Sequence, residues 1–547
     1  MLTFIKRWLA SLKNGSPSLD RMKLGPDEHG NYNPLMIQFF TWDSLQENTS
    51  WWKHFESEIP RLVELGFTQV WLPPMNKAAQ KGGRGYDAYD LWDLGEFNQK
   101  GTVATRWGTK QELLRACRSA KQQGLDVLID AVLNHKHGGD ATEKAYAIPS
   151  NPENRLKNAG EMREIETWTV FNYSGRNGKY SNFKWNQSHF TGVDFDQKTK
   201  SNAIYRFVGP GHRGWSRNVD RELGNYDYLM GNDIDHRHPD VKEDLLDWGS
   251  WILTTTGASG FRLDAIKHID HTFLIEFIRS SRQKTGQERL FSVCMCWKPS
   301  RFSLADSGAA EYWSGDIRKL LPYVRMFKGE TAFFDVPLHM SLCQASKQRS
   351  RYDLRTIFSG TLVERRPRDA ITFVDNHELI KRCLMVSKVE GQSLESWVEP
   401  AFKVQAYALI LLRGVGHPCV FYGDLYPNKE CYDENVAKNI ALLIEARQKF
   451  AYGALDEYFY DRNCIGFVRK GDAQHPGCVV VLSNKEEDSG VFIHNLRMNV
   501  GKTNAGAIYR SFMTQHGQVE IDANGWGRFT CFASHVQIWI RGDRPIL

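Results

Sequence analysis

The sequence lacks the features that mark membrane proteins, disulfide-rich secreted proteins and nucleic-acid-binding proteins. No apolar run of about 18 residues occurs, so no membrane partner is expected. A net charge of +6 over 547 residues is small and no long basic run is present, so nucleic acid is not expected either. The ten cysteines are scattered without a Cys-x-x-Cys pair, which predicts free, mostly buried thiols.

An uninterrupted apolar leader is also missing. Lys6, Arg7 and Lys13 break up the apolar residues near the start, which does not fit a secretory signal. We therefore expect a cytoplasmic protein, and we expect a monomer. Aromatic residues, in contrast, are plentiful, with 17 Trp, 20 Tyr and 30 Phe. A large core accounts for most of them, although flat rings also line clefts that bind sugars.

Helical patterns alternate with short apolar segments along much of the chain. Residues 109–123 and 240–253 carry apolar side chains at helical spacing. The expected strands are 67–73, 126–133, 260–263, 290–293, 370–374 and 419–421. Strands that alternate with helices predict βα units and a parallel sheet.

Two stretches depart from this alternation. Residues 134–230 are too long for a plain loop, and beyond residue 451 short strands and turns take over. We therefore expect a barrel domain A at 1–133 and 231–450, an inserted domain B at 134–230 and a C-terminal β-sandwich domain C at 451–547. The predicted fold class is α/β: a (β/α)8 TIM barrel with a small domain inserted after strand 3 and a C-terminal antiparallel β-domain.

An acidic residue or a histidine follows several of the expected strands, in the segments DAVLNH, GFRLDAIKH, AEYW and FVDNH. The C-terminal ends of barrel strands line the active site, which predicts a shared cleft for Asp264, Glu311 and Asp375. Arg262 lies two residues before Asp264, so both side chains point to the same face, and the cation favours an ionised nucleophile. The Tyr-Trp pair after Glu311 favours a raised pKa, which suits a general acid. Taken singly, an acid after a strand is more often a helix cap or a surface residue than a catalytic group.

With these segments in place, the chain resembles the alpha-amylase family of glycoside hydrolases from about residue 34 to residue 540. The likeness is greatest to the liquefying alpha-amylases of bacteria and to fungal intracellular alpha-amylases. The matching stretches include GYDAYDLWDLGEFNQKGTV, YSNFKW, GNYDYLM, DIDHRHPDV, FFDVPLH, GQSLES and VFYGDLY. The resemblance implies retaining endo-hydrolysis of alpha-1,4-glucosidic bonds in starch, glycogen and maltooligosaccharides.

The resemblance also implies the roles of individual residues. Asp264 is the expected nucleophile, Glu311 the acid/base and Asp375 the transition-state stabiliser. The residues expected to contact sugar are Tyr86, His135, Arg262, Lys267, His268 and His377.

A calcium ion is the one cofactor that the resemblance implies. Its expected ligands are Asn134, Asp227, Asp233 and the backbone carbonyl of His268, and oxygen ligands are those that Ca²⁺ prefers. By residue type alone these acids could be ordinary turn residues. Further metal positions of the nearest relatives fall on Thr191 and Ser216, which carry no carboxylate, so we expect only the main Ca²⁺.

The chain departs from the family pattern at two places. Residues 294–309 separate the strand at 290–293 from Glu311, and extra residues near 379–390 follow Glu378, where the family has Asp. Either these segments are real loops at the rim of the cleft, or they are translated introns. The Cys-Met-Cys at 294–296 can be encoded by a string that contains GTATGT, which favours the intron for the first segment.

Two other functions stay open at this stage. Transglycosylation uses the same residues, with a sugar in place of water as the acceptor. A catalytically weak glucan-binding protein is the third possibility, and only the segment before Glu311 supports it.

Overall fold

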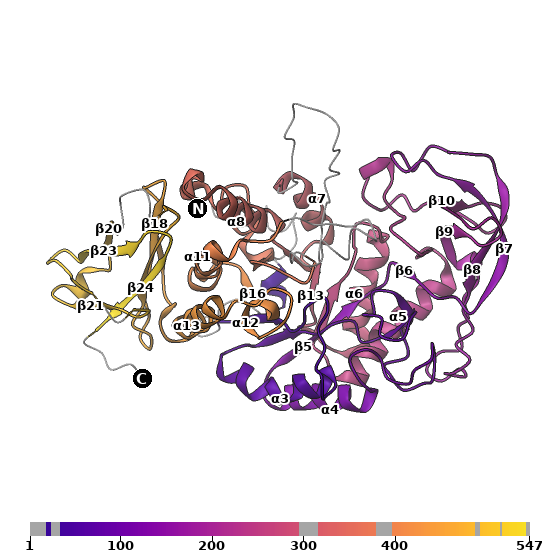
Figure 1. Ribbon diagram of the computed structural model, residues 1–547, viewed down its shortest axis with the longest axis horizontal. Coiled ribbons are helices and arrows are strands. Elements are labelled where there is room, and N and C mark those ends of the chain that lie inside the picture. The colour runs from indigo at the N-terminus through magenta and orange to yellow at the C-terminus, as the bar shows by residue number, and fades with distance from the viewer. Residues whose placement is uncertain are drawn as a thin grey trace. The chain divides into compact units, whose positions relative to one another are not determined.

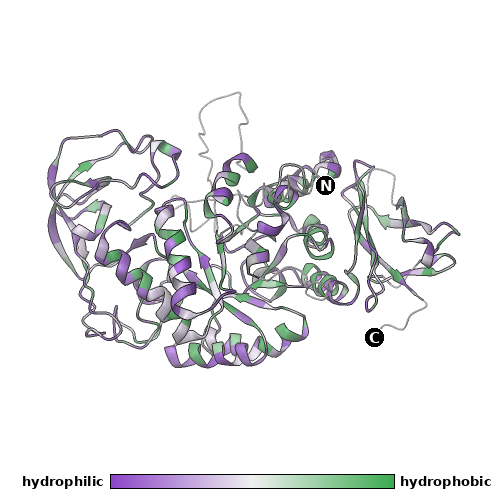
Figure 2. Cartoon of the chain, turned by 180° about the vertical axis from the view of Figure 1, so that it is seen from behind, coloured by the Kyte–Doolittle hydropathy of each residue, from purple (hydrophilic) through white to green (hydrophobic). Residues whose placement is uncertain are grey.

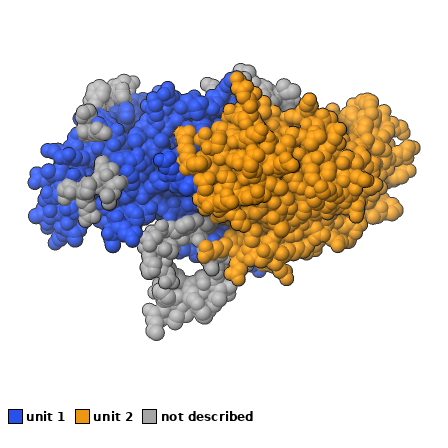
Figure 3. Space-filling model, turned by 90° about the horizontal axis from the view of Figure 1, so that it is seen from below, with its two compact units in different colours: residues 1–43, 62–68, 298–547 blue, residues 44–61, 69–297 orange. Residues whose placement is uncertain are grey.

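The computed structural model describes residues 18–22, 33–294, 316–378, 396–486, 493–514 and 517–542. The chain divides into two compact units, which Figure 3 colours separately. One consists of residues 44–61 and 69–297, and the other of residues 1–43, 62–68 and 298–547. Within the described ranges, no helix is both long and apolar enough to cross a membrane.

Eight strands close into a barrel in the order β1-β16-β15-β14-β13-β12-β5-β2. They are β1 (Met36–Gln38), β2 (Gln69–Trp71), β5 (Asp126–Ala131), β12 (Gly260–Leu263), β13 (Phe291–Cys294), β14 (Ala332–Phe334), β15 (Ala370–Phe373) and β16 (His417–Phe421). All of their residues except Asp126 are buried, as expected of parallel strands covered on both faces. The predicted barrel is confirmed, and six of its strands lie where the apolar segments predicted them.

The longer helices are amphipathic, and Figure 2 shows hydrophilic and hydrophobic residues side by side along them. They are α3 (Trp51–Glu64), α4 (Lys110–Gln122), α5 (Pro239–Thr256), α6 (His271–Thr285), α7 (Ile317–Phe327), α8 (Val336–Gln348), α11 (Pro400–Leu412) and α13 (Glu434–Phe450). The short ones are α2 (Ser18–Arg21), α9 (Leu362–Arg365) and α12 (Tyr422–Leu425). Helix α4 shows why the predicted boundaries hold: Thr109 and Glu112 form a capping box at its start, and its buried face is Leu113, Ala116, Cys117 and Ala120.

A six-stranded sheet is inserted after β5, the third barrel strand in chain order, as predicted. Its order is β6-β11-β9-β10-β7-β8. The strands are β6 (His135–Lys136), β7 (Ala141–Pro149), β8 (Arg163–Val170), β9 (Phe190–Asp196), β10 (Ser201–Phe207) and β11 (Asn232–Ile234), and β7 to β10 are purple to magenta in Figure 1. A separate small hairpin joins β3 (Lys77–Ala78) to β4 (Ala88–Asp90).

Two antiparallel sheets make up the C-terminal part, drawn in yellow in Figure 1. One contains β17 (Leu455–Tyr458), β18 (Cys464–Arg469), β19 (Cys478–Ser483), β24 (Val536–Arg541), β21 (Ile508–Ser511) and β22 (Gln518–Glu520), and the other pairs β20 (Ile493–Asn499) with β23 (Trp526–Phe532). Val479, Met498, Phe529 and Trp539 belong to one shared core, which confirms the predicted β-domain. The four-domain division at residues 133, 230 and 450 remains our proposal.

The thiols behave as predicted wherever the structure describes them. No disulfide joins the eight described cysteines, and all of them except Cys431 are buried. Cys296 and Cys383 lie outside the described residues.

Candidate active site

Asp264 follows the carboxyl end of β12 and is held there by Arg262. The Arg262 Nη1 atom lies 2.6 Å from Asp264 Oδ1 and 2.8 Å from Asp130 Oδ1. Arg262 and Asp130 are direct partners in the parallel pairing of β12 with β5. The Arg262 and Asp130 side chains have no exposure, whereas the Asp264 side chain is 14% exposed. The buried Arg262 guanidinium therefore contacts two carboxylates, and of these only Asp264 is accessible to solvent.

Asp130 anchors this end of the site. Its Oδ2 accepts hydrogen bonds from Trp71 Nε1 at 3.0 Å and from the Tyr86 hydroxyl at 2.7 Å. Burial raises the Asp130 pKa to about 6, while the Arg262 cation opposes that rise. The Arg262 guanidinium also lies 4.8 Å from the centre of the Trp71 ring. Together these contacts fix both Tyr86 and Arg262 against one buried carboxylate.

His135 begins β6, directly after the third barrel strand. Burial lowers its pKa to about 4, so the ring is neutral. Its Nε2 lies 2.9 Å from the carbonyl oxygen of Tyr86, and therefore carries the proton that it donates there. Its Nδ1 is left to accept from Asn134 Nδ2 at 3.3 Å. The structure thus brings together Tyr86, His135, Arg262 and Asp264 within one compact unit.

In the other unit, Asp375 and His377 follow the carboxyl end of β15. Asp375 is 3% exposed, and its Oδ1 accepts a hydrogen bond from the backbone N–H of Val398 at 3.1 Å. His377 is fully buried; its Nδ1 lies 2.8 Å from Gln38 Nε2, and its ring stacks on Trp42. Because Gln38 Nε2 can only donate, His377 Nδ1 accepts this bond.

Lys267 and His268 follow Asp264 and turn toward the inserted segment. Lys267 Nζ lies 2.8 Å from Glu222 Oε2. His268 donates its Nδ1–H to the carbonyl of Tyr226 at 2.7 Å, and burial lowers its pKa to about 3. Between them and Asp264, Ala265 has a positive φ of 51°, a sparsely populated conformation for a residue with a side chain. Because of this turn, the chain leaves Asp264 in a different direction before it reaches Lys267 and His268.

Glu311 lies outside the described residues, as do 295–309 and 379–390. Its expected role and the origin of both extra segments therefore remain predictions. The described chain ends at Cys294, the last residue of β13, and resumes at Asp316 before α7.

The expected calcium ligands form a buried group of oxygen atoms. Asn134, Asp227 and Asp233 are at most 1% exposed, and Asn134 Oδ1 and Asp233 Oδ1 accept no hydrogen bond from the described residues. The Asn134 carbonyl accepts a hydrogen bond from the N–H of Ile234, the residue after Asp233, at 3.0 Å. Burial raises the pKa of Asp227 to about 7, and burial together with the Asp227 charge raises that of Asp233. Burial disfavours the ionised form of both carboxylates, and two buried oxygen atoms in the group receive no hydrogen bond from the described residues. A hard cation would compensate both.

Thr191 and Ser216, which fall at further metal positions of the nearest relatives, both contact the expected calcium ligands. Thr191 donates its hydroxyl to Asp233 Oδ2, and the backbone N–H of Ser216 donates to Asp227 Oδ2 at 2.7 Å. The Ser216 hydroxyl donates to Asp270 Oδ2 at 2.8 Å. Both hydroxyls thus act as donors to acids, a role that no carboxylate could take.

A second group of metal-binding side-chain types lies at the start of α5. The ligand atoms of His189, His238 and Asp240 are all within 4.8 Å of one another. However, His189 Nδ1 accepts a hydrogen bond from the backbone N–H of Asn186 at 3.0 Å. The neutral ring then carries its proton on Nε2 and offers no lone pair to a metal. His189 therefore serves the capping box of the 3-10 turn Gln187–His189 rather than a metal centre.

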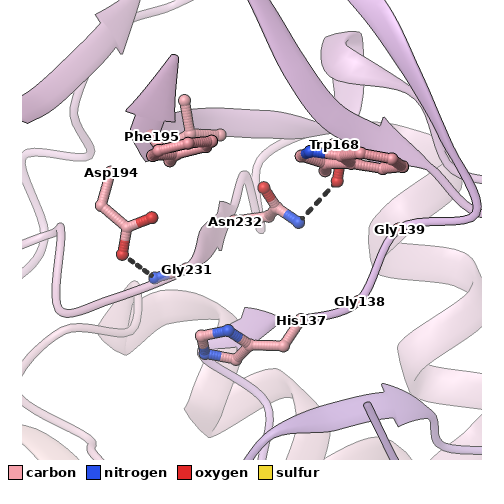
Figure 4. A pocket seen from close by; sticks show the side chains of 9 residues that line it. His137, Gly138, Gly139, Trp168, Asp194, Phe195, Gly231 and Asn232 are labelled. Atoms are coloured by element: carbon pink, nitrogen blue, oxygen red, sulfur yellow. Dashed lines mark hydrogen bonds between the residues drawn. The ribbon is translucent and has the colours of Figure 1, made fainter. Parts of the chain in front are cut away.

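A pocket of about 260 Å³ opens in the inserted sheet (Figure 4). It is lined by His137, Gly138, Gly139, Trp168, Val193, Asp194, Phe195, Gly231 and Asn232. The Trp168 and Phe195 rings lie on one side of the view and His137 lies on the opposite side. Trp168 is 42% exposed, so its ring face is available to a ligand, and Asp194 and Asn232 supply polar groups beside it.

The family profile described as "Alpha amylase, catalytic domain" matches residues 42–442. The chain belongs to the alpha-amylase family. It is 41% identical over 516 residues to a glucan 1,4-alpha-maltohexaosidase of a Bacillus species, covering 94% of this chain and 93% of that protein. It is 38% identical over 521 residues to the cytoplasmic alpha-amylase of Escherichia coli, covering 93% and 99%. Among solved structures, an alpha-amylase from Geobacillus thermoleovorans has a TM-score of 0.58 at 16% identity, over 94% of this chain and 99% of that one. This last likeness supports the fold.

In this member of the alpha-amylase family, the expected site residues also contact charged side chains that the sequence patterns did not single out. Asp130 pairs with Arg262, and Lys403 pairs with both Asp375 and Asp424. A signal existed for two of them. Asp130 is an acid inside the apolar strand DVLIDAVL, and Lys403 is a cation inside the apolar helix PAFKVQAYALILL. A charge in such surroundings needs a buried partner.

Proposed function

We propose that this glycoside hydrolase cleaves alpha-1,4-glucosidic bonds inside starch, glycogen and maltooligosaccharide chains with retention of configuration. The observation that carries the proposal is the pair formed by Asp264 and the buried Arg262 at the carboxyl end of β12. A carboxylate that is held by a cation and partly open to solvent suits a nucleophile. The names of the amylase and maltohexaosidase relatives support the substrate class.

In the proposed mechanism, Asp264 attacks the anomeric carbon while Glu311 donates a proton to the departing glycosidic oxygen. Water, activated by Glu311, then hydrolyses the glycosyl ester on Asp264. A retaining enzyme needs the two carboxyl groups about 5–5.5 Å apart. Asp375 binds sugar hydroxyls as the ring distorts, and Tyr86, His135, Lys267, His268 and His377 contact the sugars around the cleavage point.

We propose further that Asn134, Asp227, Asp233 and the His268 carbonyl hold one Ca²⁺. The two buried oxygen atoms without donors and the two disfavoured carboxylates support this assignment. The ion would supply a positive charge that balances the negative charges of Asp227 and Asp233. The name of the Escherichia coli relative supports a cytoplasmic place of action.

The pocket beside Trp168 fits the same substrate. A sugar ring presents an apolar face that suits an aromatic side chain, and hydroxyls that suit Asp194 and Asn232. We propose that it binds a glucose unit of a long chain, which would favour substrates that extend beyond the cleavage point.

Incubation with maltoheptaose tests the proposal. We expect shorter oligosaccharides from internal cleavage, with new reducing ends that start in the alpha configuration when followed by proton NMR. Products longer than the substrate would instead indicate transglycosylation. Binding without any turnover would contradict the enzyme and favour a glucan-binding protein.

A further inference from the structure

The acid after β15 is held by a lysine that lies on a different element. Lys403, in the first turn of α11, places Nζ 2.9 Å from Asp375 Oδ2 and also contacts Asp424 Oδ1. The Tyr407 hydroxyl, one turn further along α11, donates to Asp424 Oδ2 at 2.7 Å. Lys403 is only 6% exposed. These four residues form a buried chain of charged groups and one neutral hydroxyl, which we call the Lys403 network.

We propose that Lys403 is a positioning residue that orients the Asp375 carboxylate and keeps it ionised for the sugar. This inference rests on the proposed role of Asp375. The two oxygens of Asp375 have different partners: Val398 N–H holds Oδ1 and Lys403 holds Oδ2. The Val398 hydrogen bond holds Oδ1 and the Lys403 ion pair draws Oδ2 toward α11, so the orientation of Asp375 depends on both partners.

The charges around Asp375 make the lysine necessary for the ionised form. Burial raises the Asp375 pKa to about 7, Asp424 raises it as well, and Lys403 is the cation that lowers it. Among the residues that the structure describes, the other titratable groups that face Asp375 or the adjoining Val374 carbonyl are Tyr407, Cys343, Cys431 and His339. Burial keeps the first three protonated and His339 neutral, so none of them supplies a second cation.

A purely structural lysine would give a different result. If Lys403 only neutralised two buried acids, its loss would lower stability without changing the pH at which the enzyme becomes active. If it holds Asp375 ionised, its loss raises the Asp375 pKa further, because an opposite charge this close lowers a carboxylate pKa by about 1–3 units. Activity that needs the ionised acid would then begin at a higher pH.

The test is the pH profile of kcat/KM for maltoheptaose hydrolysis by the full-length chain. For Lys403→Met we expect the acid limb to move up by about one pH unit or more, with a loss of about tenfold or more at pH 6 that shrinks as the pH rises. Lys403→Arg retains a cation and should keep the limb close to that of the wild type. The matched control is Lys438→Met, which removes an exposed lysine paired with Glu434 on α13 and should change nothing.

Two further variants distinguish a failure of the inference about Lys403 from a failure of the proposed role of Asp375. Lys403→Met/Asp424→Asn removes one charge of each sign, so it serves if the single variant does not fold. It should show an upward shift smaller than that of Lys403→Met, because the Asp424 charge that also raises the Asp375 pKa is gone. Asp375→Asn tests the proposed role on which the inference rests. If Asp375→Asn is inactive but the Lys403 variants keep the acid limb of the wild-type pH profile, the inference about Lys403 is overturned and the proposed role of Asp375 stands. An Asp375→Asn variant within about tenfold of wild type would overturn both.

Discussion

At the scale of single residues, the buried Arg262 guanidinium is shared between the carboxylates of Asp130 and Asp264. Arg262 has no exposure and contacts two carboxylates, of which only Asp264 reaches solvent. Asp130 also receives hydrogen bonds from Trp71 and Tyr86, so its negative charge is satisfied inside the protein. Asp264 has fewer partners and is the acid of this pair that can react.

Replacing Asp264 by Asn should abolish turnover and leave the fold intact. An amide cannot form the glycosyl ester, so we expect kcat to fall by more than about 1,000-fold. The measurement is the rate of reducing-end release from maltoheptaose, with circular dichroism to check folding. Asp247→Asn changes an exposed acid paired with Lys284 and is the matched control. Activity within about tenfold of wild type would reject Asp264 as the nucleophile.

At the scale of elements, the proposed general acid Glu311 follows strand β13 in the sequence. Strand β13 pairs with β12 in register, with Val293 opposite Arg262 and Cys294 opposite Leu263. A short connection would use these strand hydrogen bonds to place Glu311 close to Asp264. Residues 294–309 make that connection longer, and long loops cost little free energy but position side chains less well.

Deleting residues 294–309 should therefore give a more soluble and more active enzyme if the segment is a translated intron. The comparison is kcat/KM for maltoheptaose in the full and the shortened chain, together with sequencing of the mature transcript. A transcript that retains the segment, combined with lost activity on deletion, would show instead that it is a functional loop of the active site.

At the scale of the whole molecule, the proposed calcium ion would link the inserted sheet to the barrel. Asn134 follows β5, Asp233 lies in β11, and His268 follows β12. One ion bound to all three would tie together segments that are distant in sequence. Its contribution to stability follows from mass action, because a ligand that binds only the folded state stabilises it, by about 2.7 kcal/mol at 100 times the dissociation constant.

Chelation with EGTA should lower the melting temperature by several degrees and reduce activity in parallel. Asp233→Ala should melt at the lower temperature already and should not respond to EGTA. Asp240→Ala, which alters the His189–His238–Asp240 group instead, should still respond as the wild type does. A melting curve of the wild type that is indifferent to chelator would contradict the calcium site.

Much of the fold follows from local patterns in the sequence. Helix α4, the strand at 260–263 and the strands of the C-terminal domain all lie where the sequence patterns predicted them. Strands β1 and β14 were not predicted; each has only three residues, which is too short a run to show a clear periodicity on its own. Arg262 and Asp264 also share a face as predicted, since side chains in a strand alternate with a period of two.

The partners of those residues depended on tertiary structure. Asp130 faces Arg262 because β5 and β12 pair in one particular register, and Lys403 reaches Asp375 because α11 packs beside the end of β15. Neither contact has a local signal beyond a charge in an apolar segment. The sequence by itself determined which residues could carry the chemistry, because their types and spacing are local properties. Only the folded chain decided which buried charge neutralises which, because that pairing depends on contacts between segments far apart along the chain.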